Sequence, residues 1–444
     1  MLNAGRALNS SQPLRSASIG RRPRLTVYCR KHLSSNTVGS AAGRADSVSH
    51  FPNKYLIGLT GNIAVGKSTV RQMLQHLGGY PIDADSLAHQ AMQPGAPAYK
   101  PIVDTFGAFI LNSDKSINRG ALGAIAFSNP LALQRLEQIT HPIVRQAVLA
   151  LVQRAKQRVV VIEAIKLLEG DLAKVVDEVW VVNAKPETQY RRLLSKRSMT
   201  PEEAKKRILG QGSQAEKLKK ANVIIENDGN VEETWKQVQK AWNHIVNRAL
   251  DKVASGGNPL VTSTTETAPI PLQVPVMAPG TLHVGIKRGM PTNADRIAAF
   301  MTHVTGKPVN RMDVMLSFGN KSFLMAHDQH EDVLGIIGWQ VENLITRCDE
   351  LVLKPNVPVK AVIDAFVKAV EEFSRELESE VGFVFLPMDV AKDVPAAFAV
   401  NGYQTVTVNQ ITVPAWREAV TEAGGNNLLV LEKRLRKDRV LKPI

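Results

Sequence analysis

The sequence has little cysteine and no long apolar run, and each shortage excludes a class of protein. Its 444 residues include two cysteines, Cys29 and Cys348, which lie far apart and show no metal-ligand spacing. Neither a disulfide framework nor a zinc site is therefore indicated, and a reducing compartment fits the composition. No segment approaches the roughly 20 consecutive apolar residues that a membrane-spanning helix needs. We therefore expect no membrane partner.

The chain is also short of acidic residues at its N-terminal end. Residues 1–53 contain eight Lys and Arg but a single acid, Asp46, so about an eighth of the chain carries half of the net charge of +14. This Arg- and Ser-rich stretch lacks hydrophobic periodicity and cannot bury a core. It is typical of an organellar transit peptide, of a disordered basic tail, or of translation from too early a start codon. We favour a disordered segment and a cytoplasmic protein, with an organellar location as the alternative.

The remaining positive charge is spread thinly over the rest of the chain, apart from a cluster at Lys217, Lys219 and Lys220. A nucleic-acid groove needs a concentrated basic surface. An anionic small substrate or a solvated face explains the cluster better, and we expect no nucleic-acid partner.

One stretch carries a phosphate-binding motif. Residues 55–70 read YLIGLTGNIAVGKSTV, in which the pattern G-x-x-x-x-G-K-[ST] begins at Gly61 and ends at Ser68. The two glycines let the backbone curl so that N–H groups point at phosphate oxygens, while the following helix presents its N-terminus. We expect Lys67 to reach the outer phosphates of a nucleotide and Ser68 to hold Mg²⁺. An apolar run before the motif and helical spacing after it fit a strand–loop–helix unit.

Short apolar strands alternate with helical patterns from residue 54 to about residue 250. The expected strands are Tyr55–Leu59, Tyr80–Asp83, Val159–Ile162, Glu178–Val182 and Val223–Ile225. The expected helices are Val70–Leu77, Leu131–Gln157, Pro186–Ser195, Pro201–Gln211 and Val231–Asn247. This alternation predicts an α/β fold, a three-layer α/β/α unit around a parallel sheet.

A linker and a second domain follow. Residues 254–280 lose periodicity and are rich in Ser, Thr, Pro and Gly. The later elements that we expect are helices Ala294–Val304 and Val359–Ser374 and strands Ser322–Ala326, Val333–Trp339, Gly382–Leu386 and Leu428–Leu431. We therefore divide the chain into a basic segment (1–53), a phosphate-loop (P-loop) domain (54–250), a linker (251–281) and an α+β domain (282–444).

Two carboxylates, Asp83 and Asp85, follow the second expected strand, beside the place where the γ-phosphate of a bound nucleotide should lie. One could take the proton of an acceptor hydroxyl, and the other could hold a magnesium-bound water. A helix N-cap together with a surface acid would give the same pattern. The motif alone leaves both interpretations open.

A cluster of cations, which includes Arg192 and Arg197, lies on or just after one expected helix and precedes a second, Lys-rich helix. In phosphoryl-transfer enzymes a mobile lid brings cations over the phosphates in this way. A solvated charged face is the alternative. Because a phosphate-binding loop and its lysine are also present, we favour the lid.

Several short motifs, taken in order, resemble those of the dephospho-coenzyme A kinase family. They are IGLTGNIAVGKSTV, IDADSLAHQAMQPGAPAY, FG with INRGAL nearby, THPIVR, VNAKPETQYRRL, and ILGQ followed by ANVIIENDG, within about residues 55–245. The resemblance implies ATP-dependent phosphorylation of the 3′-hydroxyl of dephospho-coenzyme A, with ATP and Mg²⁺ as cofactors. Another small-molecule or nucleoside kinase, or a nucleotide-binding scaffold, is the alternative.

The resemblance implies three sets of site residues. The nucleotide-binding set is Gly61, Asn62, Ile63, Ala64, Val65, Gly66, Lys67, Ser68 and Thr69, with Arg192 and Arg197 in the lid and Asn227 beside the adenine. Asp85 would be the catalytic base, supported by Asp83 and Lys67. The acceptor pocket would include Leu87, Ala88, His89, Arg119 and His141. The chain departs from the family at Lys166, where a proline is usual.

The second domain resembles the N-acetyltransferase superfamily in residues 286–296, 335–339 and 397–404. That superfamily binds the pyrophosphate of acetyl-coenzyme A with the N–H groups of a glycine-bearing turn. Here the corresponding stretch, Leu353–Lys360, has no glycine and two prolines, which lack N–H groups. We therefore expect a folded but catalytically silent relative that acts in docking or regulation, and we assign it no site residues.

Overall fold

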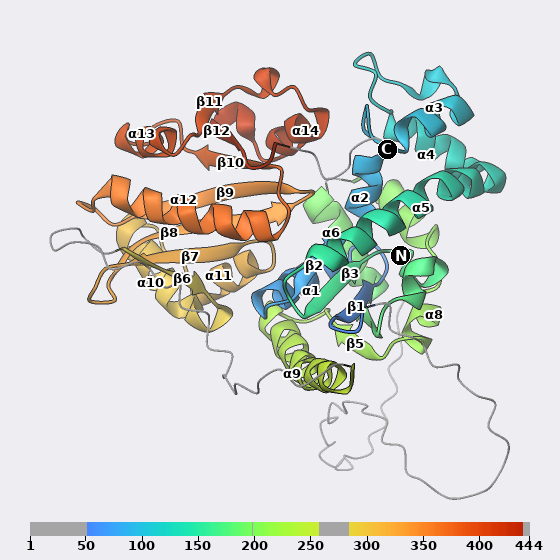
Figure 1. Ribbon diagram of the computed structural model, residues 1–444, viewed down its shortest axis with the longest axis horizontal. Coiled ribbons are helices and arrows are strands. Elements are labelled where there is room, and N and C mark those ends of the chain that lie inside the picture. The colour runs from blue at the N-terminus through green and yellow to red at the C-terminus, as the bar shows by residue number, and fades with distance from the viewer. Residues whose placement is uncertain (1–50, 198, 257–283, 438–444) are drawn as a thin grey trace, which may run out of the picture. The chain divides into compact units, whose positions relative to one another are not determined.

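Two β-sheets organise the protein, and a computed structural model describes it at residues 51–197, 199–256 and 284–437 (Figure 1). The first sheet is wholly parallel, in the order β2-β3-β1-β4-β5. Its strands are β1 (Tyr55–Thr60), β2 (Tyr80–Asp83), β3 (Val159–Glu163), β4 (Glu178–Asn183) and β5 (Val223–Glu226). The connection from β1 to β2 crosses β3, while β4 lies on the other side of β1. The loop after β1 therefore stands where the strand order reverses, which is where open α/β sheets bind ligands.

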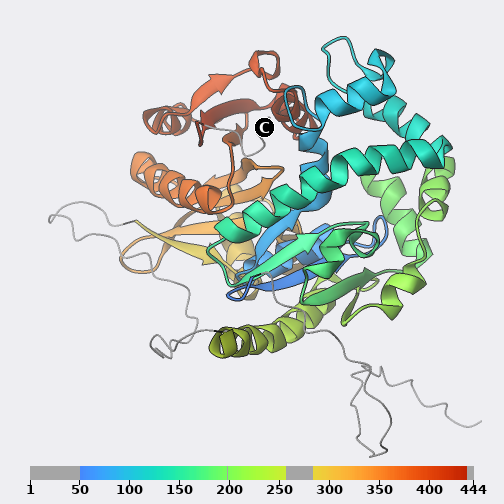
Figure 2. The ribbon, with the colours of Figure 1, turned by 45° about the vertical axis from the view of Figure 1, so that its right-hand side comes forward.

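Both faces of this sheet are buried. Successive residues of a strand point to opposite faces, and because these strands are largely apolar, each face presents apolar side chains to the helices that cover it. Ile57 and Val161 belong to one hydrophobic cluster, whereas Leu56 and Val160 belong to another. Helices α1 (Lys67–His76) and α9 (Val231–Gly256) cover the first face. Helices α2 (Ala84–Ala91) and α5 (Pro130–Arg154) cover the second face and run beside each other (Figures 1 and 2).

The remaining helices of the first domain surround the carboxyl edge of the sheet. Helices α3 (Tyr99–Phe106) and α4 (Arg119–Ser128) form a small cluster with the start of α5. Helices α6 (Pro186–Arg197) and α7 (Pro201–Leu209) pack together against Ile63 in the loop after β1. The short helix α8 (Gln214–Lys219) follows them.

The second sheet is mixed, in the order β11-β12-β10-β9-β8-β7-β6. Its strands are β6 (Gly285–Gly289), β7 (Ser322–His327), β8 (Val333–Glu342), β9 (Ile345–Leu353), β10 (Val381–Leu386), β11 (Gln404–Val406) and β12 (Leu429–Arg434). All neighbouring strands are antiparallel except β9 and β10, which are parallel. The long crossover helix α12 (Val359–Glu376) connects these two strands.

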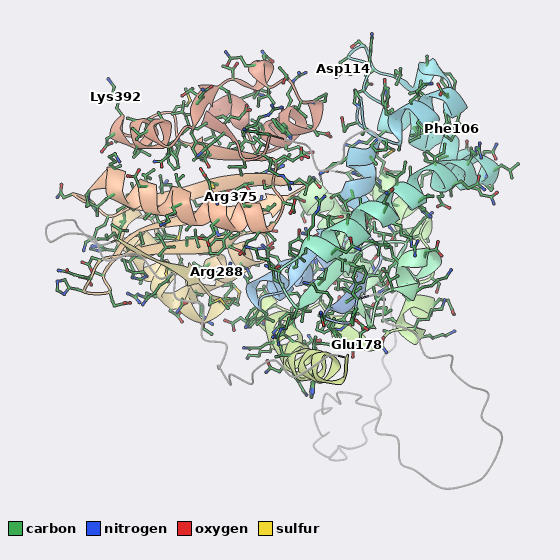
Figure 3. The ribbon with its side chains drawn as sticks, viewed as in Figure 1. Phe106, Asp114, Glu178, Arg288, Arg375 and Lys392 are labelled. Carbon is green, nitrogen blue, oxygen red and sulfur yellow. The ribbon has the colours of Figure 1, made fainter. Side chains whose placement is uncertain are left out.

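Helices α12 and α13 (Asp393–Val400) contribute to the hydrophobic cluster on one face of this sheet, and α14 (Pro414–Glu422) packs near its β10–β12 end. Arg288 of β6, labelled in Figure 3, places its guanidinium 3.9 Å from the ring centre of Phe373 on α12. Helices α10 (Ala294–Thr305) and α11 (Arg311–Phe318) cover the opposite face.

The two sheets share one hydrophobic core. A single cluster of buried side chains joins Met73 of α1 and Trp235 of α9 to Met315 and Phe318 of α11. Both sheets lie in one compact unit, Ser49–Ile444. The second domain therefore packs directly on the helix that follows the phosphate-binding motif.

The predicted fold class is confirmed, with a parallel α/β sheet followed by a mixed sheet. All five strands predicted for the first sheet are present within about one residue of their expected ends. The boundaries proposed between domains stay a prediction. The basic N-terminal segment lies almost wholly outside the described residues, and the expected linker lies outside them from residue 257 on, since residues 251–256 belong to α9. Within the described ranges no helix has both the length and the apolarity that crossing a membrane requires.

Candidate active site

The loop between β1 and α1 has the backbone shape that its two glycines permit. Gly61 has a φ of +147°, and a Cβ there would lie 2.5 Å from the carbonyl oxygen of Val182. Gly66 has a φ of +96°, and a Cβ there would lie 2.1 Å from the side-chain nitrogen of Asn227. Any other residue at either position would meet both strain and a clash. The glycine spacing is thus required by the fold of the loop.

Helix α1 opens directly out of this loop, with Gly66 as its N-cap residue. Gly66 has no side chain with which to cap this helix end, and a helix N-terminus of this kind suits an anion. Lys67 is buried and donates to the carbonyl oxygen of Asn62 at 3.3 Å, which folds its side chain back across the loop. The loop thus fits the phosphates of a nucleotide.

Two side chains from outside the motif donate hydrogen bonds to backbone carbonyls of the loop. The amide nitrogen of Asn227 donates to the Val65 carbonyl at 2.7 Å, and its oxygen accepts from Thr234 at 2.8 Å. Arg192 donates to the carbonyls of Ala64 and Val65, each at 3.1 Å, and to that of Asn227 at 2.6 Å. Arg192 and Asn227 thus reach the predicted site, but these bonds are made to the loop's own backbone.

Two glutamines that the sequence analysis did not select hold the other side of the loop. Gln211 accepts from the N–H of Ile63 at 2.7 Å, and Gln214 accepts from the N–H of Asn62 at 3.0 Å. Both follow the helices α6 and α7. The lid region is therefore tied to the loop by hydrogen bonds as well as by apolar packing. The ILGQ motif, which contains Gln211, was the available signal.

Asp85 lies where the ends of β2 and β3 meet. Its carboxylate accepts from the N–H of Ile165 at 3.1 Å, while Lys217 donates to the Ile165 carbonyl at 2.8 Å. Burial and the charge of Asp83 raise the pKa of Asp85, against the opposing effects of the Ile165 hydrogen bond, Lys67 and Lys217. The charge of the loop lysine thus acts on Asp85, and the role of Asp85 as the base stays a prediction.

Asp83 has one oxygen committed to structure and one facing a cation. Oδ1 accepts from the N–H of Ser86 at 2.9 Å, which makes Asp83 the N-cap of α2. Oδ2 lies 4.0 Å from a guanidinium nitrogen of Arg71. The N-cap interpretation left open by the sequence is thus confirmed, and it leaves the second oxygen on the side of the site.

A buried ion pair completes the acidic edge. Arg71 donates from Nε to Glu163 at 2.6 Å, and the other oxygen of Glu163 lies 3.5 Å from the hydroxyl of Ser68. Burial raises the pKa of Glu163, although the charge of Arg71 opposes this. Neither residue was selected from the sequence, because the pair forms only when α1 crosses the end of β3.

The residues expected in the acceptor pocket fall into two groups. Arg119, at the start of α4, lies 3.4 Å from the His89 ring and also donates to Glu418 of α14 at 2.6 Å. Leu87 is buried in the core of the second sheet face, and Ala88 packs against it. His141 is exposed on α5. The structure thus joins His89 to Arg119, while Leu87 and Ala88 support the helix that carries His89.

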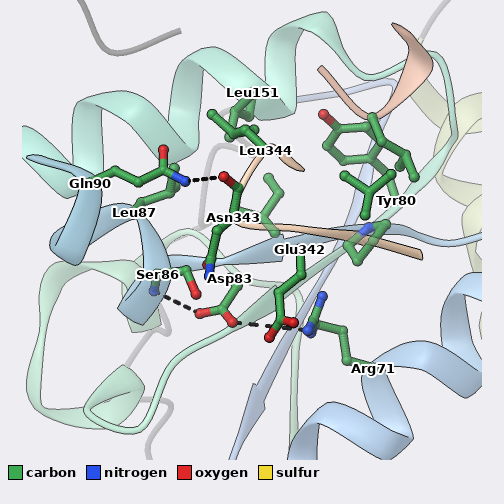
Figure 4. A pocket seen from close by; sticks show the side chains of 14 residues that line it. Arg71, Tyr80, Asp83, Ser86, Leu87, Gln90, Leu151, Glu342, Asn343 and Leu344 are labelled. Carbon is green, nitrogen blue, oxygen red and sulfur yellow. Dashed lines mark hydrogen bonds and ion pairs between the residues drawn. The ribbon is translucent and has the colours of Figure 1, made fainter. Parts of the chain in front are cut away.

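A cavity of about 50 Å³ opens beside Asp83, between α2 and the β8–β9 turn (Figure 4). It has room for a few waters. Ligand pockets usually measure roughly 300–1,000 Å³, so this cavity alone is too small for a nucleotide-like acceptor. The side chain of Arg197 is outside the described part of the chain.

The donors present suit Mg²⁺ held mainly by substrate. Among the described residues no group of three or more His, Cys, Asp or Glu side chains is arranged to hold a metal. Mg²⁺ commonly takes one or two protein ligands together with phosphate oxygens and waters. The exposed hydroxyl of Ser68, beside Glu163, offers such a ligand.

Comparison with known proteins places this chain in a family. The family model for dephospho-CoA kinase matches residues 55–233. The dephospho-CoA kinase of Geobacter sulfurreducens is 43% identical over 190 residues, which make up 42% of this chain and 96% of the relative. The chain belongs to the dephospho-CoA kinase family. The solved structure of TT1252 from Thermus thermophilus is 29% identical and covers 44% of this chain and 98% of its own, with a TM-score of 0.40.

Beyond the dephospho-CoA kinase region, the chain matches a putative acyl-CoA N-acyltransferase from Klebsiella pneumoniae. The identity is 14%, the match covers 34% of this chain and 98% of that chain, and the TM-score is 0.26. The stretch Leu353–Lys360, which lacks the glycine-bearing turn, leads into α12, and this helix starts after Pro358. Asn356 in the turn before α12 has a φ of +60°. The expectation that this domain is catalytically silent stays a prediction.

Proposed function

We propose that the chain transfers the γ-phosphate of ATP to the 3′-hydroxyl of dephospho-CoA, which yields CoA and ADP. Family membership across nearly the whole length of a relative that bears this name supports the reaction. The observation that carries the proposal within the structure is the position of Asp85, whose carboxylate accepts from the N–H of Ile165 just beyond the carboxyl end of β3. Another nucleoside kinase or a scaffold is not favoured by the comparisons.

The phosphates of ATP bind to the N–H groups of the loop and to the start of α1. Asp85 accepts the proton of the ribose 3′-hydroxyl as its oxygen attacks the γ-phosphorus and the bond to the β-phosphate oxygen breaks. A raised pKa brings this carboxylate closer to the basicity that proton transfer needs. Lys67 balances the charge that spreads over the transferred group, and Lys217 holds the Ile165 backbone that positions Asp85.

Mg²⁺, when bound, would neutralise phosphate charge, and Ser68 is the side chain that would hold it. Glu163 orients the Ser68 hydroxyl. Asp83 caps the N-terminus of α2, the helix that carries Asp85. On the acceptor side, Arg119 of α4 lies beside His89 of α2. We propose that Arg119 pairs with a phosphate of dephospho-CoA, since its guanidinium suits that geometry.

The variant Asp85→Asn tests the role of the base. It keeps the size of the side chain but cannot accept the proton, so we expect turnover to fall by roughly 10²–10⁴-fold. ATP affinity should change little, because the substitution leaves the backbone N–H groups of the loop and the start of α1 in place. Steady-state kinetics with dephospho-CoA and calorimetric titration with ATP measure the two effects. Turnover within a factor of about three of the unsubstituted protein would reject Asp85 as the base.

A further inference from the structure

The second domain inserts a tight turn beside the acidic edge of the kinase site. The turn joins β8 to β9 at Asn343 and Leu344, which both have positive φ values, 56° and 61°. Successive residues of this kind form the turn that best matches the twist of a two-stranded hairpin. The amide nitrogen of Gln90 on α2 donates to the Asn343 carbonyl at 2.5 Å, and Leu344 is buried. The turn is therefore anchored in the kinase domain.

Glu342, the last residue of β8, faces Arg71 across the small cavity (Figure 4). Burial of Arg71 acts to lower its pKa, but the charges of Glu163, Asp83 and Glu342 outweigh this and raise it. The buried guanidinium is thus stabilised by two carboxylates from the kinase domain and by a third from the second domain.

Arg71 is connected to the nucleotide site through Glu163. The guanidinium holds one oxygen of Glu163 at 2.6 Å, and the other oxygen lies 3.5 Å from the Ser68 hydroxyl. The gap between Arg71 and Asp83 is wider, at 4.0 Å. Glu342 lines the same cavity as Arg71, and its charge acts on the same guanidinium. A continuous charged path therefore runs from the second domain to the residue proposed to hold Mg²⁺.

We propose that Glu342 is a positioning residue of the kinase site, and that the second domain uses it to hold Arg71 so that Glu163 stays beside Ser68. This inference rests on the proposed function. Without the third carboxylate, Arg71 balances its charge with Glu163 and Asp83 alone. The guanidinium then closes on Asp83, draws Glu163 with it and withdraws that carboxylate from the Ser68 hydroxyl. The second domain thus contributes to the metal-binding edge without touching a substrate.

The test compares ATP binding with and without Mg²⁺ in the full-length chain. The variant Glu342→Gln keeps the shape of the side chain and removes its charge. Its affinity for metal-free ATP should equal that of the unsubstituted protein. The extra affinity that Mg²⁺ confers should fall by roughly three- to tenfold, which is less than the 10–100-fold typical of a residue that directly supports a metal ligand. Calorimetric titration with ATP in EDTA and in excess Mg²⁺ measures both values.

Two further variants separate positioning from general stability. Glu376→Gln removes another carboxylate of the second domain, one that lies 3.7 Å from Lys156 of the kinase domain and is not among the charges that raise the pKa of Arg71. It should leave the Mg²⁺ effect unchanged. Glu342→Asp keeps the charge and should restore part of the effect. An unchanged Mg²⁺ effect in Glu342→Gln, or an equal fall in Glu376→Gln, would overturn the proposal.

These readouts need no acceptor. If dephospho-CoA were not the substrate, turnover with it would be absent in every variant, and yet the Mg²⁺ effect on ATP binding would still report on Glu342. Failure of the proposed reaction and failure of the positioning role therefore give different results.

Discussion

Asn227 bonds to the backbone of the nucleotide loop, and its expected place beside the adenine stays a prediction. The family resemblance put it beside the adenine, and the structure does place it at the nucleotide loop. Yet both ends of its amide are bound inside the protein, to Val65 and to Thr234, at 2.7 and 2.8 Å. It also fills the space above Gly66 that a Cβ would need. Its side chain therefore supports the loop.

Removing this amide should weaken the loop without changing base selection. In Asn227→Ala the Val65 carbonyl and the Thr234 hydroxyl lose a buried partner, which should lower the free energy of unfolding by about 1–3 kcal/mol. The KM for ATP and the KM for GTP should rise by the same factor, because the loop binds phosphates common to both. Urea denaturation and kinetics with the two nucleotides measure these effects. A changed preference between ATP and GTP at unchanged stability would instead assign the side chain to the base.

At this scale the sequence predicted what a local motif encodes. The glycine spacing, Lys67 and the Asp83–Asp85 pair are readable because the loop and the strand end have fixed spacings. The pair of Arg71 and Glu163 is not readable, since its members are 92 positions apart and meet only after β3 is placed beside β2. The same holds for Glu342. Only the tertiary fold brings these charges together.

Helix α1 carries two functions on two faces. Its first turn offers N–H groups to phosphate, and its outer face packs on the second domain through Gln72 and His76. His76 bonds the Phe318 carbonyl at 3.0 Å and meets the Phe318 ring edge-on at 5.2 Å. Burial is the main cause that lowers the pKa of His76, to about 4. The interface is therefore built around a neutral imidazole.

This histidine makes stability depend on pH. An unfolded histidine has a pKa of about 6.5, so between about pH 6.5 and pH 4 the unfolded chain binds the proton more tightly. The contribution is present in full above about pH 6.5 and is lost as the pH falls towards 4, at a cost of about 2 kcal/mol by pH 5 and about 3 kcal/mol by pH 4. Urea denaturation at pH 7 and at pH 5 should show this fall.

The variant His76→Gln provides the control for the pH effect, because glutamine can still donate to the Phe318 carbonyl but does not titrate. Its free energy of unfolding should fall less between pH 7 and pH 5 than that of the unsubstituted protein. Equal falls in the two proteins would show that His76 does not cause the effect.

Most elements were predictable where apolar periodicity was clean. The five strands of the parallel sheet are short apolar runs, and each was found. Strand β9 was missed, since Arg347, Asp349 and Glu350 interrupt its apolar pattern while β8 and β10 supply its pairing. Helices α11 and α13 were missed as well, because each has only eight residues.

Across the whole molecule, the fusion of two folds has a physical consequence. The hydrophobic core that contains Met73 and Trp235 of the kinase domain also contains Met315 and Phe318 of the second domain. Ion pairs reinforce the junction, among them Arg311 with Glu232 at 2.8 Å. The sequence indicated a separate, silent module joined by a linker. The structure shows that side chains of this module lie in the same hydrophobic cluster as those of the kinase domain, which composition and periodicity cannot reveal.

The central claim concerns the reaction of the whole chain, and one assay addresses it directly. The full-length protein is incubated with ATP, Mg²⁺ and dephospho-CoA, or with a panel of nucleosides, and the products are resolved by chromatography and phosphorus NMR. We predict stoichiometric ADP and CoA that bears the new phosphate on the ribose 3′-oxygen, with nucleosides phosphorylated at least about a hundredfold more slowly. Phosphorylation of a nucleoside while dephospho-CoA is left intact would contradict the account.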